Sequence, residues 1–386
     1  MARMGWFALL ALLPACLGSG GSGGGGGFGG PLGDGLAFDA TASGADGAQT
    51  PETTAVDADA KASSDTAPKD AAGTDGAAKD SGAPVASGAT APNCIDGQYA
   101  ETLPSTTGDI AALKAGYTPA GANAFVLDVL KVRYPFGVVL IQTALKKQDC
   151  IAMFLNGNNL KTASGAMSML STLVHECGHL ADLGAGGFDT STYIIQSGVK
   201  MSCSGASHNG ANQGFARSLL QKDEYAKLRP ACPAKGPNGC DSYASVYLDG
   251  DPNDGKFQGG DQAFSSVMEE TTQYVNSLVT DYAFGDQSQF SISSRDGILT
   301  FLWYTERYLH MARLQFPEVH AYILGQPCWR QLILTVWGRA WLYLETTKTN
   351  QKLTIDGAKI LPLVMDADLL AEIELVRKAQ GCTPAP

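Results

Sequence analysis

The chain has 386 residues and a formal net charge of −11, with 38 acidic side chains against 27 lysines and arginines. Proteins that bind nucleic acid carry clustered positive charge, so this composition favours no nucleic-acid partner. Beyond the N-terminus, the sequence contains no run of 18 or more apolar residues. No transmembrane helix is therefore predicted.

Residues 1–16 have the features of a signal peptide. A positive charge is followed by an apolar run at 6–13, which is too short to span a bilayer, and by the sequence LPAC. This ending resembles a bacterial lipoprotein signal, in which Cys16 becomes the acylated first residue. The alternative is an ordinary secretory cut just before it. By resemblance to Gram-negative lipoproteins, Leu17 in place of aspartate implies outer-membrane sorting, with the domain in the periplasm or at the cell surface.

Residues 17–92 have a different composition from the rest of the chain. A glycine run leads into a tract of Ala, Asp, Thr, Ser and Pro, which offers too few bulky apolar side chains to fold. The segment holds ten acidic residues against three lysines, so its net charge of −7 supplies most of the total of −11. We predict a disordered tether at 17–92 and a folded domain at 93–386.

The folded part begins with helical patterns. Residues 119–132 predict a helix with Thr118 as its cap and Pro135 beyond its end. Residues 136–147 predict a second helix, although their β-branched run leaves a strand open. The short apolar run CIAMFL at 150–155 precedes Asn-Gly and is typical of a strand and turn, whose edge is a candidate for peptide binding.

The sequence HECGH at 175–179 matches the H-E-x-x-H metal-binding motif. On a helix, His175 and His179 lie one turn apart on the same face, so their imidazoles can converge on one ion. Glu176 is then within reach of a metal-bound water and can act as general base. The motif helix is predicted to begin at a Ser164 cap and to end at Gly184.

The pattern after the motif predicts a hairpin at 190–204, turning at Ser197-Gly198, and a helix at 212–228. Helical patterns then dominate, at 264–282, 298–314, 318–324, 328–344 and 366–380. Their aromatic residues are predicted to form core, namely Trp303, Tyr304, Tyr308, Trp337 and Trp341. The expected fold class is α+β and predominantly α-helical, with a small β region around the motif helix and a helical C-terminal half.

Eight cysteines remain when Cys16 is set aside. An even number in an exported protein predicts up to four disulfides. Cys232 and Cys240 are the best local pair, because prolines and glycines form a compact loop between them. Cys177 lies inside the motif but points away from the histidine face, so we expect a structural half-cystine or a buried thiol.

A catalytic zinc site needs a third protein ligand and leaves a fourth position for water. Glu269 and Glu270, on the first predicted helix of the C-terminal half, are candidates, and Asp189 and His208 are others. Asp182 lies one turn beyond the motif and is expected to support the site without binding the metal.

The motif, together with a later helix that carries E-x-x-x-Q, resembles the gluzincin group of zinc metallopeptidases. The resemblance implies a zincin-like fold with one catalytic zinc ion, Glu269 as the third ligand and Gln273 as a supporting residue. That group often has an acid where Gln273 stands. Glu270 followed by Tyr274 is the alternative register. The stretch around Asp189 resembles the aspartate-ligand zincins more faintly.

If the site is complete, zinc lowers the pKa of a bound water and polarises a substrate carbonyl, while Glu176 transfers the proton to the leaving amine. His310 and His320 are candidate donors to the oxyanion. The metzincin pattern is excluded because Ala185 occupies the position of its third histidine. An acidic loop at 249–254 suggests calcium only weakly, since it lacks the glycine and glutamate of an EF-hand.

The sequence therefore predicts an exported, lipid-anchored zinc metallopeptidase that acts on a protein or peptide substrate. The alternative is a non-catalytic cell-surface binding or structural lipoprotein, in which zinc only cross-links helices. A metallohydrolase that cleaves a non-peptide bond of the envelope is a third interpretation.

Overall fold

The computed structural model describes residues 89–187, 190–205, 219–220, 223–228, 243–248, 264–288 and 291–382. These residues are mostly helical, with one two-stranded sheet among them, so the prediction of a predominantly α-helical protein is confirmed. The predicted signal peptide with Cys16, the body of the tether and the acidic loop at 249–254 lie outside the described residues.

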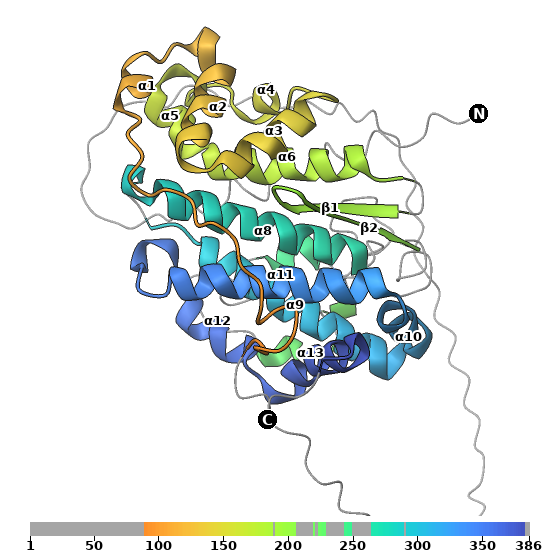
Figure 1. Ribbon diagram of the computed structural model, residues 1–386. Coiled ribbons are helices and arrows are strands. Elements are labelled where there is room, and N and C mark those ends of the chain that lie inside the picture. The colour runs from red at the N-terminus through yellow and green to blue at the C-terminus, as the bar shows by residue number, and fades with distance from the viewer. Residues whose placement is uncertain are drawn as a thin grey trace, which may run out of the picture. The chain divides into compact units, whose positions relative to one another are not determined.

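The helices before the motif lie on one side of the motif helix (Figure 1). They are α1 (Ala111–Ala115), α2 (Ala122–Arg133), α3 (Pro135–Leu145), α4 (Cys150–Phe154) and α5 (Ala163–Ser168). Thr118 caps a 3₁₀ turn that leads into α2, as its predicted role requires. The segment 136–147, for which the sequence left both a helix and a strand open, forms helix α3. Its buried residues Phe136, Leu140 and Ala144 recur at every fourth position.

The apolar run at 150–155 forms helix α4, so the strand prediction is wrong. The Asp149 side chain caps the helix by accepting a hydrogen bond from the Ala152 amide. Cys150, the first residue of the helix, is disulfide-bonded to Cys177. Local capping and a long-range covalent bond therefore override the strand propensity. Without a strand there, the run offers no edge for peptide binding.

The motif helix α6 spans Leu170–Ala185 and ends at Gly186, two residues later than predicted. The expected cap at Ser164 is also displaced, because Thr162 caps the short helix α5 by accepting from the Gly165 amide. A break at Met169 separates the two helices. The motif therefore sits in the middle of a separate helix of 16 residues.

The predicted hairpin is confirmed as the antiparallel strands β1 (Thr190–Gln196) and β2 (Val199–Ser204). Gly198 makes the turn with φ of 81°, a left-handed conformation that favours glycine. The amide of Ile194 donates to the Asp182 carboxylate at 2.8 Å, and Tyr193 donates through its hydroxyl to the Ser265 carbonyl at 3.0 Å. The hairpin is thereby fastened to both α6 and α8 (Figure 1).

The C-terminal half consists of long helices, and the five helices predicted there are confirmed. They are α8 (Phe264–Phe284), α9 (Ser294–Gln315), α10 (Pro317–Gly325), α11 (Pro327–Thr346) and α13 (Ala367–Gln380). The structure adds α7 (Ala244–Tyr247) and α12 (Gly357–Val364), which were not predicted. Of the helix expected at 212–228, the described part contains a 3₁₀ turn at Ala226–Leu228.

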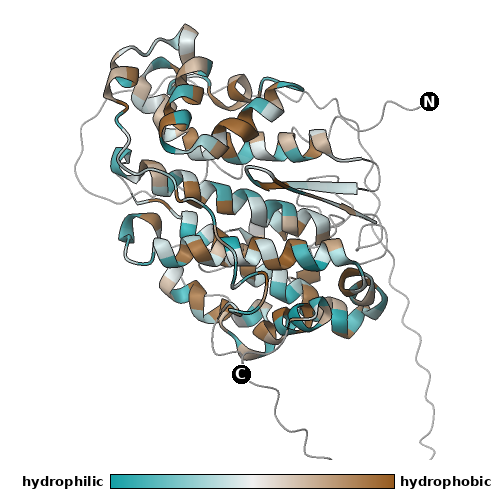
Figure 2. Ribbon diagram, in the orientation of Figure 1, coloured by the Kyte–Doolittle hydropathy of each residue, from teal (hydrophilic) through white to brown (hydrophobic). Residues whose placement is uncertain are grey.

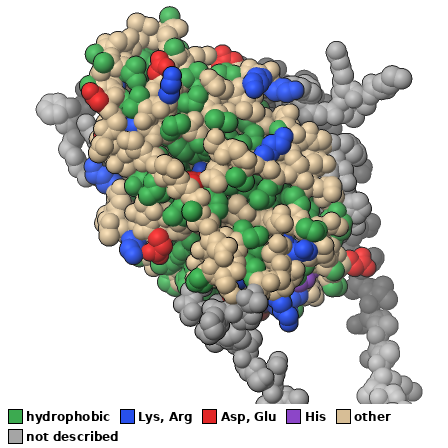
Figure 3. Space-filling model, in the orientation of Figure 1, with side chains coloured by type: hydrophobic (Ala, Val, Ile, Leu, Met, Phe, Trp, Pro, Cys, Tyr) green, Lys and Arg blue, Asp and Glu red, His purple; other side chains and the backbone are tan. Residues whose placement is uncertain are grey.

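The core lies where these long helices meet. The aromatic residues predicted to be core are between 0% and 8% exposed, which confirms that interpretation. Figure 2 shows brown apolar bands alternating with teal ones along the helices, as expected of helices that bury one face. On the face shown in Figure 3, charged side chains are few and are spread among apolar and uncharged ones. Among the described helices, none combines the length and the apolar character needed to cross a bilayer.

The first described segment, before α1, runs across α11 and α8 towards the motif side of the protein (Figure 1). Ala89 accepts a hydrogen bond from the Trp337 indole, and Asp96 forms a buried ion pair with Arg377. Among the described residues, tertiary contacts are therefore present from residue 89, slightly before the predicted domain boundary at 93.

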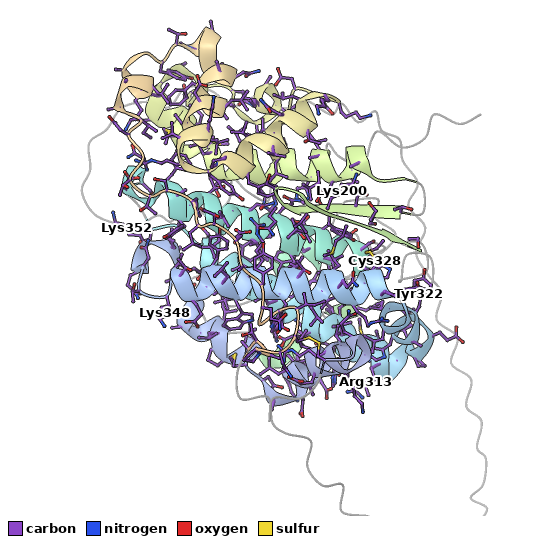
Figure 4. The ribbon with its side chains drawn as sticks, in the orientation of Figure 1. Lys200, Arg313, Tyr322, Cys328, Lys348 and Lys352 are labelled. Carbon is purple, nitrogen blue, oxygen red and sulfur yellow. A yellow bond between two sulfur atoms is a disulfide. The ribbon has the colours of Figure 1, made fainter. Side chains whose placement is uncertain are left out.

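Three disulfides join distant elements of the described chain: Cys94–Cys382, Cys150–Cys177 and Cys203–Cys328. The expectation that Cys177 is a structural half-cystine is confirmed. Cys328, the second residue of α11, joins that helix to β2 (Figure 4). The predicted pair Cys232 and Cys240 lies outside the described residues.

Candidate metal centre

Helices α6 and α8 pack antiparallel along a polar seam. On α8, the residues Glu269, Gln273, Ser277 and Asp281 recur at every fourth position and therefore share one face. They contact α6 in the opposite chain direction, except that the partners of Gln273 and Glu269 are exchanged. Asp281 accepts from Ser171 at 3.0 Å, Ser277 meets His175 at 3.0 Å, Gln273 donates to Asp182 at 2.8 Å, and Glu269 meets His179.

Three side chains of this seam converge as metal ligands would. The Oε2 atom of Glu270 lies 3.6 Å from Nε2 of His175 and 3.5 Å from Nε2 of His179. These three ligand atoms all lie within 4.8 Å of one another. The histidines are 2% exposed and Glu270 is 0% exposed. A buried His–His–Glu group that can hold a metal ion is therefore present.

The hydrogen bonding of the group fits a cation. Nε2 of His179 and both carboxylate oxygens of Glu270 are buried without a hydrogen-bond partner. Buried polar atoms are normally satisfied, so such a cluster points to a ligand. Two ligands at about 2.0–2.1 Å from a tetrahedral zinc ion stand roughly 3.3–3.4 Å apart. The spacings in the seam are close to that value.

Residues of α8 contact both imidazoles at Nδ1, on the side of the ring away from Nε2. Nδ1 of His175 lies 3.0 Å from the Ser277 hydroxyl, and Nδ1 of His179 is hydrogen-bonded to the Glu269 carboxylate. A carboxylate accepts hydrogen bonds, so we assign the proton of His179 to Nδ1, which leaves Nε2 free to bind a metal. Metal-binding histidines usually have such a partner, which fixes the ring and raises its basicity.

The structure thus exchanges the roles expected of the two adjacent glutamates. Glu270, the alternative candidate, faces both Nε2 atoms, whereas Glu269 lies behind His179 as a supporting residue. Asp182 stands outside the ligand group: one of its oxygens accepts from the Ile194 amide and the other from Gln273. Asp189 and His208 lie outside the described residues.

The close approach of the two helices depends on Gly178. A Cβ atom at this position would lie 1.9 Å from Oε1 of Gln273, which is inside the van der Waals contact distance. Gln273 continues a buried hydrogen-bond chain, because its Oε1 accepts from Asn276, whose own oxygen accepts from Arg339. The glycine of HECGH is therefore required for packing, in addition to the two ligands.

The electrostatics of the seam favour positive charge at the ligands. Burial lowers the pKa of His179, but the Glu269 and Glu270 carboxylates outweigh it and hold the pKa well above its usual value. Burial raises the pKa of Glu270, yet His179 and His175 bring it below its ordinary range. Burial, followed by the Glu269 charge, raises the pKa of Asp182. The field at this point therefore suits a cation.

Glu176, the predicted general base, follows His175 on α6 and is 4% exposed. The two histidines considered as oxyanion donors are engaged on other helices. His310 lies 2.8 Å from the Glu372 carboxylate of α13, and His320 lies 3.9 Å from the same carboxylate. Neither is among the seam contacts described above.

Sequence reasoning missed Ser277 and Asp281. The signal that would have found them is the spacing itself, since four polar residues at intervals of four share one face of a helix that is buried over most of its length. Such a polar face on a buried helix needs partners on a neighbouring helix.

The fold and the site define a mostly helical protein with a buried His–His–Glu centre of the metal-binding type. Comparison with protein-family models, with curated proteins and with solved structures finds no match to this chain. The function of this chain must therefore be inferred from the chemistry of the site.

Proposed function

We propose that the protein is a zinc metallopeptidase of the gluzincin type. One observation carries the proposal: the H-E-x-x-H histidines and a glutamate from a later helix form a three-ligand set with unpaired buried ligand atoms. Three protein ligands leave a fourth position for water, which is typical of catalytic and not structural zinc sites. Glu270 supplies the third ligand and Tyr274 stands four residues beyond it.

The choice of zinc follows from the donors. Two imidazole nitrogens and one carboxylate oxygen are the ligands of known catalytic zinc sites, whereas calcium and magnesium prefer oxygen alone. A zinc ion held by His175, His179 and Glu270 would supply Lewis-acid chemistry at a substrate carbonyl. Glu176 is the residue that would take a proton as general base and pass it to the leaving amine. Ser277 and Glu269 keep the imidazoles of His175 and His179 in the orientation that binding requires.

The compartment is part of the proposal. The signal-like residues 1–16 and the acidic tether imply export, with Cys16 as a lipid anchor at the outer membrane. The three disulfides fit an oxidising compartment. The substrate would then be a protein or peptide at the cell envelope.

The test is zinc analysis and casein hydrolysis by the full chain and by its Glu176→Gln variant. We expect one zinc ion per chain in both proteins, with activity in the variant lower by about 10²–10⁴-fold, the usual contribution of a general base. A chain that binds no zinc, or a variant that keeps full activity, would overturn the proposal.

One observation favours the alternative of a structural zinc. His175, Glu176, His179 and Glu270 are all between 0% and 4% exposed, which resembles a closed site more than an open one. X-ray absorption at the zinc edge separates the two functions. A water ligand supports the peptidase, whereas a fourth protein nitrogen or a sulfur supports a cross-linking role.

A further inference from the structure

The H-E-x-x-H motif of this chain has a disulfide in its middle. Cys177 lies two residues from His175 and two from His179, and its sulfur is bonded to Cys150, the first residue of α4. Both cysteines are 0% exposed. At 100° per residue, the Cys177 side chain projects about 160° away from each histidine. The two faces of α6 are therefore held differently. His175 and His179 contact α8 on one face, and Cys177 is covalently bonded to α4 on the other.

The ligand face of α6 depends on how the helix is rotated about its axis. His175 and His179 face Glu270 through their Nε2 atoms, at 3.6 and 3.5 Å, and Asp182 of the same helix accepts from Gln273 of α8 at 2.8 Å. A bond at the opposite pole of the helix prevents α6 from rotating about its axis, and a rotation would take both imidazoles away from Glu270.

We propose that the Cys150–Cys177 disulfide makes metal binding redox-dependent: the oxidised chain holds its metal, and reduction by a dithiol loosens it. In this step the S–S bond breaks, two electrons and two protons pass from the dithiol to Cys150 and Cys177, and the dithiol becomes a disulfide. The proposal rests on the metal centre proposed above but not on peptidase activity. Because the bond is buried, the dithiol gains access when the five-residue helix α4 opens locally.

The chain contains a matched control. Cys203–Cys328 joins β2 to α11 and closes a sequence separation of 125 residues, against 27 for Cys150–Cys177. Loop-closure entropy makes the longer loop the more stabilising one. If metal affinity only followed overall stability, removal of the control disulfide would weaken zinc binding at least as much.

The first experiment compares full chains carrying Cys150→Ser with Cys177→Ser, or Cys203→Ser with Cys328→Ser. Zinc affinity is measured by competition with a chromophoric chelator. We expect the first pair of substitutions to weaken affinity by about tenfold or more, the range found for residues that orient metal ligands. The control pair should leave affinity within about twofold. Equal losses in the two variants would overturn the proposal.

The second experiment uses the unmutated chain, so it does not depend on how a variant folds. Dithiothreitol is titrated against zinc-loaded and zinc-stripped protein, and free thiols are alkylated and located by mass spectrometry. Because linkage is reciprocal, zinc should protect Cys150–Cys177 from reduction by the same factor by which the disulfide strengthens zinc binding. Zinc should leave Cys203–Cys328 unchanged.

The outcomes separate the two proposals. A chain that binds no zinc overturns the proposed function and this inference together. A chain that binds zinc equally well with Cys150–Cys177 intact or reduced overturns this inference alone.

Discussion

Glu269 and Glu270 are neighbours in sequence, yet their carboxylates have different partners. Glu270 faces the Nε2 atoms of both histidines, and Glu269 accepts from Nδ1 of His179. Only the first arrangement allows direct binding of the metal. The second acts on the metal through the imidazole.

Substitution of each glutamate should therefore have a different effect on zinc. We expect Glu270→Ala to abolish stoichiometric zinc binding, because two imidazoles alone remain. Glu269→Gln should retain zinc with an affinity lower by about 10–100-fold, the usual effect of losing a residue hydrogen-bonded behind a ligand. Chelator competition on the two full-length variants measures both values. Retention of zinc by Glu270→Ala together with its loss from Glu269→Gln would reverse the assignment.

A second prediction concerns Gly178. The substitution Gly178→Ala would press a Cβ against the Gln273 amide, so we expect α6 and α8 to separate and stability to fall by about 1–3 kcal/mol. Zinc binding should weaken as well. Gly184→Ala, on the exposed end of the same helix, meets only the flexible side chain of Lys147 and should be neutral or slightly stabilising. Urea denaturation of both variants tests the difference, and equal effects would contradict the packing argument.

At the scale of secondary structure, the antiparallel helices α6 and α8 together build the site. The polar seam between them ends at Asp281, which links three helices because Ser171 of α6 and Ser294 of α9 both donate to its carboxylate. Burial raises the pKa of Asp281 from 3.8 to about 6, although these two hydrogen bonds oppose the shift. An ionised carboxylate here is unfavourable in the folded state.

The sign of the pH dependence follows from this shift. Because the folded-state pKa is the higher one, the stabilisation from the Asp281 proton is complete below pH 3.8 and is lost as the pH rises through about 6. Asp281→Asn cannot ionise, so at pH 7 it should be more stable than the natural chain by up to about 3 kcal/mol. The difference should vanish near pH 4. Urea denaturation at both pH values measures it.

Asp286 provides a control of opposite sign. The hydrogen bond from Arg133 lowers the pKa of Asp286, so its ionised form is the stabilising one. Asp286→Asn should lose stability at pH 7, and the loss should shrink as the pH falls towards the lowered pKa. If both variants changed stability in the same direction at pH 7, the assigned environments would be wrong.

Sequence patterns predicted the long elements better than the short ones. The C-terminal helices were found because their apolar periodicity extends over many turns, and the hairpin because Gly198 marks its turn. The run at 150–155 was misassigned because six apolar residues carry no decisive period, and its helix depends on the Asp149 cap and the Cys150 bond. Helix α12 was missed because Pro362 lies inside it and argues against a helix.

A disulfide joins the two ends of the described part of the chain. The segment that starts at Ala89 crosses α11, and Cys94 is bonded to Cys382, just beyond α13. Replacement of both cysteines by serine should lower the free energy of unfolding by about 2–5 kcal/mol, since the bond spans 288 residues. Zinc content should not change, because neither cysteine touches the seam. Loss of zinc in this variant would show that the centre responds to overall stability.

At this scale, the sequence predicted that the two histidines would lie together but not which glutamate would face them. His175 and His179 were predicted as a pair because the motif is local, and one helix turn determines its geometry. The choice between Glu269 and Glu270 depends on how α8 is rotated against α6. That rotation is set by tertiary contacts such as Gly178 with Gln273, which no local pattern contains.

The four polar residues at every fourth position of α8 consequently fix how α8 is rotated against α6. Neighbouring helical residues point about 100° apart, so a rotation of α8 by about that angle would present Glu269 to the imidazoles in place of Glu270. The same rotation would detach Gln273, Ser277 and Asp281 from their partners at three successive turns. Which glutamate faces the two Nε2 atoms is thus decided as far away as Asp281, three helical turns along α8.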